Sequence, residues 1–80
     1  MARQNKSTSP FEQTYPNVSE WVKGHGWIEI GYDEYSRAFV RAFDIGGTVW
    51  EGEEDYASLD VAFQALEAAL TKWMEENGFE

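Results

Sequence analysis

The strongest constraint on the fold is a long amphipathic helix predicted in the last third of the chain. Ser58 stands where an N-cap would, so its hydroxyl can accept a hydrogen bond from a free amide of the first turn. Asn77-Gly78 supplies a left-handed stop. Apolar residues recur at the spacing of one helical face, namely Leu59, Ala62, Phe63, Leu66, Ala69, Leu70, Trp73 and Met74. Polar residues occupy the other side, namely Asp60, Gln64, Glu67, Thr71 and Glu75. A stripe of this kind needs a sheet to cover.

A second, shorter helix is predicted near the N-terminus. Asn17 is a candidate N-cap, and Glu20, three residues later, completes a capping-box pattern. Trp21 and Val22 would form the buried side of this helix, and Gly24 would end it. Phe11 and Tyr15 are expected to anchor the preceding segment against the domain.

Three strands are predicted between the two helices. Alternating apolar residues and turn-forming residues place them at residues 27–32, 37–44 and 48–51. Residues 33–36 are polar enough to turn, Gly46-Gly47 would make a tight hairpin turn, and residues 52–57 would link the last strand to the final helix. The fold class is therefore α+β, in the order α-β-β-β-α, with a three-stranded antiparallel sheet covered on one face by the C-terminal helix. Residues 1–10 are expected to be a flexible tail and residues 11–80 a single domain.

The second strand can present either of two faces to the core. One face carries Ala38, Val40 and Ala42, and the other carries Arg37, Phe39, Arg41 and Phe43. An even-numbered first hairpin loop would bury the second set, including Arg41, whose desolvation is costly without a partner. We favour the odd register, because small residues complement the bulky face of the last helix. The open face would then carry the aromatic residues Trp27, Phe39, Phe43 and Trp50 beside Arg37, Arg41 and Glu29.

The net charge of the chain limits the kinds of molecule that it is expected to bind. The chain of 80 residues has six basic and fifteen acidic residues, a formal charge of −9. Phosphate would be repelled, so direct binding to nucleic acid or to an anionic membrane is disfavoured. The sequence has no cysteine, no signal-peptide pattern and no apolar run of the roughly 20 residues that cross a bilayer, which predicts a cytoplasmic location.

No motif in the sequence predicts catalysis, a metal or a cofactor. His25 lies between two glycines, without the second histidine or the cysteine of a metal set and without a Ser-His-Asp pattern, so we interpret it as a loop residue. Gly46-Gly47 is not followed by the Lys-Ser/Thr of a phosphate loop. The cluster Glu51, Glu53, Glu54 and Asp55 lacks the spacing of an EF-hand, and forms either a solvated loop or a docking patch for basic side chains.

Residues 38–75 contain a series of short motifs, namely Phe43-Asp44, the glycine turn Gly46-Gly47, a strand that ends at Gly52, and Ser58 followed by Leu59 and Ala62. In this order of motifs the segment resembles the small domain of HicB-type antitoxins. The proline of the family's aromatic-Pro-Asp motif is missing, and the linker before the last helix is longer. Membership would imply a non-enzymatic module whose acidic surface covers a basic, RNA-cleaving toxin. The predicted α-β-β-β-α order is also that of double-stranded-RNA-binding domains, but the lysines that such domains present on their last helix are replaced here by acid.

These observations predict a small, acidic, non-enzymatic protein-binding module, antitoxin-like or regulatory. Its partner is expected to be a basic protein, with a homodimer through the open sheet face as the second expectation. The predicted contact residues are Glu51, Glu53, Glu54, Asp55, Arg37, Phe39, Arg41 and Phe43. The alternative is a nucleic-acid mimic of the phage or mobile-element type that blocks a basic groove, which would need carboxylates in rows rather than around an apolar centre.

Overall fold

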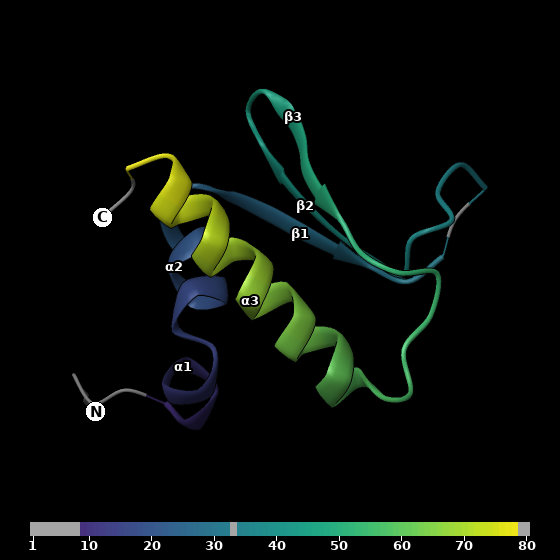
Figure 1. The fold of residues 1–80 in the computed structure, drawn as a ribbon, viewed down its shortest axis with the longest axis horizontal. Helices are drawn as coiled ribbons and strands as arrows, with labels where there is room; N and C mark the ends of the chain where they lie inside the picture. Colours follow the sequence, from purple (N-terminus) through teal and green to yellow (C-terminus); the bar gives the residue numbers. More distant parts are fainter. Residues whose placement is uncertain (1–8, 33, 79–80) are drawn as a thin grey trace, which may run out of the picture.

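The protein is a small α+β domain with one antiparallel sheet. A computed structural model describes residues 9–32 and 34–78. The elements are α1 (Pro10–Thr14), α2 (Pro16–Gly24), β1 (Gly26–Ile30), β2 (Val40–Asp44), β3 (Gly47–Glu51) and α3 (Leu59–Glu76) (Figure 1). The sheet order is β1-β2-β3, so β2 is central. This is the predicted fold class, with the short α1 as an additional element.

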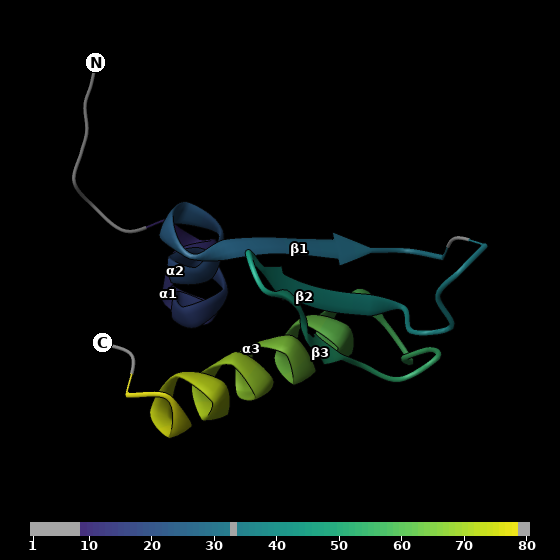
Figure 2. The same cartoon turned by 90° about the horizontal axis from the view of Figure 1, so that it is seen from above.

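The helices lie on one side of the sheet. In Figure 2, α3 runs along one face, and α1 and α2 stand at the start of β1. No helix within the described residues covers the opposite face, which we call the outer face. The core lies between α2, α3 and the covered face, with Trp21, Val40, Leu66 and Leu70 fully buried. α3 buries Ala62, Leu66, Leu70 and Met74 of the predicted stripe. Phe63, Ala69 and Trp73 are partly buried, and Leu59, at the start of the helix, is exposed.

The first hairpin has the odd register. Ile28 pairs with Ala42 and Ile30 with Val40, so the small residues of β2 face α3, as predicted. A register shift between Ala42 and Phe43 interrupts the pairing with β3. As a result Trp50 stands opposite Ala42 and packs against the core, so the expectation that Trp50 lies on the open face is wrong.

The first two strands are shorter than predicted, and the third is one residue longer. β1 ends at Ile30 and β2 begins only at Val40, because the described residues of the connecting loop of residues 31–39 are irregular. The second hairpin turns at Ile45 and Gly46, while Gly47 already belongs to β3. Gly47 has a φ of 118°, a conformation that favours glycine, which explains why the glycine pair is placed at this turn.

The start of α2 differs from the capping prediction. Tyr15 is the N-cap and makes no side-chain capping hydrogen bond, and Pro16 is the first helical residue. Asn17 is therefore inside the helix, and the capping box with Glu20 does not form. Trp21 is buried as predicted, whereas Val22 is exposed because it lies on the side of α2 that faces away from α3. The buried indole Nε1 of Trp21 donates to the carbonyl of Phe43 at 3.0 Å, which ties α2 to β2.

The ends of α1 and α3 are capped locally. Ser9 accepts from the amide of Glu12 at 3.2 Å and starts α1, so the described part of the predicted tail, Ser9 and Pro10, is ordered as a helix start; residues 1–8 lie outside the described residues. Phe11 packs against Tyr15 and Phe63, as expected. In α3, Ser58 accepts from the amide of Val61 at 3.2 Å, and Gly78 has a φ of 66°. None of the helices in the described ranges has the length and apolarity that a bilayer crossing requires.

Candidate protein-binding surface

Two aromatic residues lie together on the outer face of the sheet. Trp27 and Phe43 are direct cross-strand partners, and their rings stack with centroids 5.4 Å apart and planes 6° from parallel. Trp27 is 47% exposed. Its indole N–H donates to the carboxylate of Glu29 at 3.3 Å, which orients the ring along the face. Stacked rings in contact with water are a feature that binding surfaces favour.

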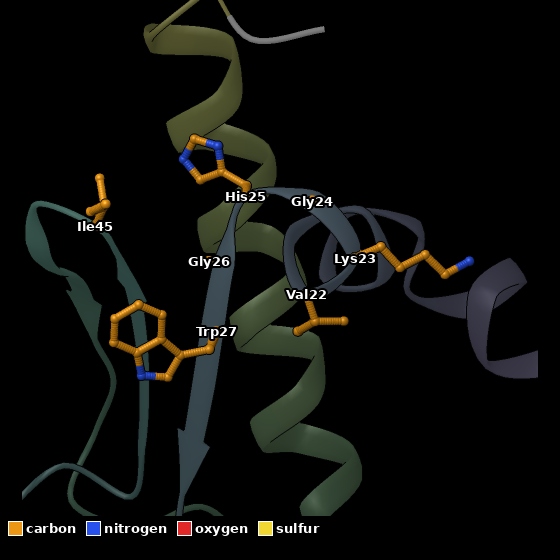
Figure 3. A pocket seen from close by; sticks show the side chains of 7 residues that line it. All are labelled: Val22, Lys23, Gly24, His25, Gly26, Trp27 and Ile45. Atoms are coloured by element: carbon orange, nitrogen blue, oxygen red, sulfur yellow. The ribbon is translucent and has the colours of Figure 1, made fainter.

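An open groove of about 470 Å³ adjoins this pair (Figure 3). Val22 and Lys23 of α2 stand on one side of β1, and Trp27 and Ile45 stand on the other. Ile45, at the tip of the second hairpin, is fully exposed, and Val22 is about half exposed. Gly24 lines the groove and has open space where a Cβ would stand, so no side chain fills the groove at this position. We call Val22, Trp27, Phe43 and Ile45 the apolar patch.

Arg41 does not belong to the accessible surface, contrary to the prediction. Its side chain lies on the outer-face side of β2 but the residue is only 5% exposed. One guanidinium nitrogen donates to the carbonyl of Gly31 at 3.1 Å, to Ser36 Oγ at 3.1 Å and to the carbonyl of Ala38. Another lies 3.5 Å from the carboxylate of Glu29. Oxygen atoms of the loop of residues 31–39, together with the Glu29 carboxylate, thus bind the guanidinium group and offset the cost of burying its charge. In turn, Arg41 holds that loop in place.

Phe39 is also not an exposed contact residue. It precedes β2, it is half-buried, and its ring packs against Tyr32 and Tyr56 beside the core. A substitution such as Phe39→Ser would therefore remove packing rather than simply open a binding face. Of the predicted aromatic contact residues, only Phe43 remains on the open part of the outer face.

The predicted acidic cluster Glu51, Glu53, Glu54 and Asp55, which we call the acidic linker, is held against the loop of residues 31–39. The amide of Phe39 donates to the carbonyl of Glu53 at 2.9 Å, and Tyr32 donates its hydroxyl to the carbonyl of Glu54 at 2.6 Å. Glu54 also forms an exposed ion pair with Arg37, at 2.9 Å. Glu51, Glu53 and Asp55 are exposed as well, so the predicted acidic run does form a surface. It lies at the end of the sheet away from Ile45 (Figure 1).

His25 is a packing residue in the turn between α2 and β1. The centroid of its ring lies 4.2 Å from that of Trp21 and 5.3 Å from that of Trp73. Its Nε2 atom is 3.5 Å from the Asp44 carboxylate. Within residues 9–32 and 34–78, no group of three or more His, Cys, Asp or Glu side chains is arranged to hold a metal ion.

The sequence prediction missed two members of the apolar patch. Val22 was assigned to the core, and Ile45 was not singled out. Ile45 does carry a signal, because an isolated large apolar residue at a hairpin tip has no core to enter. Comparison of the chain with protein-family models, with curated proteins and with solved structures found no match.

Proposed function

We propose that the protein is a non-enzymatic protein-binding module and that the apolar patch is its contact surface. The observation that carries the proposal is the exposure of Trp27, stacked on Phe43 and flanked by Val22 and Ile45, on a sheet face that no helix covers. A domain with a small core gains stability by burying a tryptophan, so an aromatic pair left in contact with water has a cost for the isolated domain. Burial against a partner removes this cost.

The composition of the patch is that of an interface centre. Tryptophan contributes more than most residue types to binding energy, and rigid rings lose little conformational freedom on binding. The open groove beside Trp27 provides space into which a side chain of the partner can insert. An aromatic pair beside a groove favours a specific contact over non-specific hydrophobic association.

Charge indicates a basic partner. The formal charge of −9 attracts a basic protein over a distance of about 10 Å at ordinary ionic strength. The acidic linker and the apolar patch lie at opposite ends of the sheet, so they are not one contact. We assign the patch to short-range affinity and the linker to the rate of encounter. The resemblance of residues 38–75 to HicB-type antitoxin domains supports the same class of function, with a basic toxin as the partner it implies.

Site-specific crosslinking in the cells that make the protein tests the proposal. A photoreactive amino acid replaces Ile45 in one variant and Gln64, on the exposed side of α3, in a control variant. We expect one predominant crosslinked protein from position 45, with an isoelectric point above neutrality, and none in common with position 64. Equal labelling from both positions would contradict the proposal.

The second candidate function is a nucleic-acid mimic, which the charge of −9 favours. The internal use of other carboxylates counts against it, because Glu12 is paired with Lys23 and Glu67 accepts hydrogen bonds from main-chain amides of α2. The two functions differ in one test. DNA or RNA displaces a mimic from its target in proportion to its concentration, whereas a partner bound through the apolar patch is displaced by loss of Trp27.

A further inference from the structure

We infer that the partner adds an extended segment to the free edge of β1, as a fourth strand of the sheet, and that this segment alternates basic and apolar residues. The inference rests on the proposed function and names the form of the partner. Its argument uses the main chain of β1 rather than the apolar patch alone.

β1 is an edge strand with one paired neighbour, β2. The amide of Gly31, directly after β1, donates to the carbonyl of Phe39 at 2.7 Å, so Gly31 faces β2. Main-chain groups of a strand point alternately to its two edges. The amides of Ile28 and Ile30 therefore point away from β2, toward the free edge. Figure 2 shows this half of β1 extending beyond α2.

The edge of β1 has one feature that can prevent strand addition, the charged side chain of Glu29, and lacks several others. Its sequence, Gly26–Ile30, contains neither lysine nor proline, and its pairing with β2 is regular along its length. The register shift of the sheet lies between β2 and β3 instead. Ile30 is exposed although it lies on the covered side of the sheet, because none of the helices that the structure describes reaches that corner. A regular edge whose one charged residue is acidic favours pairing with a strand that presents a basic residue to it.

The two faces of β1 determine the residues that an added strand would carry. On the outer face, the carboxylate of Glu29 contacts Arg41 and Trp27, but its side chain is still 46% exposed, and this exposed part would lie beside a basic residue of the partner. On the covered face, Ile30 would lie beside an apolar residue. Since residues alternate between faces, the partner segment alternates basic and apolar. A second copy of this chain fits less well, because two molecules of charge −9 repel each other.

A proline substitution at the edge tests the inference. Ile30→Pro removes an amide that points to the free edge, a position where an edge strand tolerates proline. Ile30→Thr is the matched control, since it also removes the apolar side chain but keeps the amide. The ligand is a synthetic peptide of about nine alternating lysine and valine residues, long enough to span β1. Two control peptides carry glutamate in place of lysine, or N-methylated valines that cannot pair.

Binding is followed by two-dimensional NMR of the labelled protein together with hydrogen exchange. We expect the basic peptide to slow exchange of the Ile28 and Ile30 amides about tenfold at near-saturation, and the control peptides to leave it unchanged. We expect Ile30→Pro to bind about three- to tenfold more weakly than Ile30→Thr, the loss of one main-chain hydrogen bond.

Three outcomes would overturn the inference. They are no binding of the basic peptide, binding without protection of the two amides, and equal affinities for the proline and threonine variants. Protection of these amides in the free protein at high concentration, with a rise in mass, would assign the edge to a second copy instead. The proposed function is tested apart from these results, because crosslinking from Ile45 requires a contact but no added strand.

Discussion

Glu67 of α3 caps the N-terminus of α2 by accepting hydrogen bonds from the main-chain amide of Val18. The distance is 2.9 Å, and the same carboxylate accepts from the amide of Asn17 at 3.0 and 3.1 Å. A carboxylate at this end of a helix also interacts favourably with the helix dipole. Thr71, one turn further along α3, accepts from the side-chain amide of Asn17 at 2.7 Å. α2 thus receives from α3 the cap that Tyr15 does not provide.

Removal of this cap should destabilise the domain. We expect Glu67→Ala to lower the free energy of unfolding by about 1–2 kcal/mol, because two amides at the start of α2 lose a charged acceptor. Urea unfolding followed by tryptophan fluorescence measures the change. Glu75→Ala, at an exposed position of the same helix, is the control and should change stability by less than about 0.5 kcal/mol. Equal effects of the two substitutions would refute the capping role.

Arg41 should act on stability and on the order of the loop that it holds. We expect Arg41→Ala to cost about 3 kcal/mol, because buried carbonyl groups lose their donor and Glu29 loses its cation. Arg37→Ala, which removes an exposed ion pair, should cost less than about 0.5 kcal/mol. Hydrogen exchange of residues 36–39 provides the second readout, since it should accelerate only in the Arg41 variant. A stable Arg41→Ala protein with an unchanged loop would show that the guanidinium contacts are dispensable.

The packing of α3 predicts a large effect at Leu66 and a small one at Leu59. Leu66 is fully buried between α3 and the sheet, so Leu66→Ala should cost about 2–5 kcal/mol. Leu59 is exposed, and the same substitution there should cost less than about 0.5 kcal/mol. Chemical denaturation of the two variants gives both values. A cost below about 0.5 kcal/mol at Leu66 would mean that the core is assigned to the wrong face of α3.

The acidic linker should influence the rate of association rather than stability. Neutralising Glu53, Glu54 and Asp55 together should slow association with a basic partner and flatten its dependence on salt. A control variant with the same change in charge, Glu20, Glu75 and Glu76 to glutamine, should have a smaller effect on the rate. Stopped-flow mixing at several salt concentrations compares the two. If the linker variant binds at the wild-type rate and only its melting temperature falls, the linker serves the start of α3 alone.

The sequence was sufficient to predict the elements whose signals are local. The cap at Ser58, the stop at Asn77-Gly78 and the period of the apolar residues define α3 without reference to the rest of the chain. The odd register was also predictable, because the small residues of β2 complement a bulky helix. The prediction of the strands was less accurate at their ends, since residues 31–32 and 37–39 were assigned to strands but belong to the loop between β1 and β2.

Contacts between distant residues were beyond the reach of sequence patterns. Glu67 looked like one of several solvent-facing acids on α3, and only the packing of α2 against α3 identifies its role. Arg41 was expected to avoid burial, but carbonyl groups of the loop and Glu29 satisfy it after folding. Trp50 faces the core because of a register shift that no sequence pattern in β3 predicts. The apolar patch joins residues from α2, β1, β2 and a hairpin tip, so its extent depended on the fold.

The central claim is that the apolar patch binds a protein, and the affinity of a Trp27 variant tests it most directly. The dissociation constant of the partner crosslinked from position 45 is measured for the wild type, for Trp27→Ser and for Tyr35→Ser. Tyr35 is the matched control, because it is 91% exposed and lies in the loop of residues 31–39. Circular dichroism verifies that all three proteins are folded. We predict at least about 30-fold weaker binding for Trp27→Ser and less than about twofold for Tyr35→Ser. Equal affinity of wild type and Trp27→Ser would contradict the account.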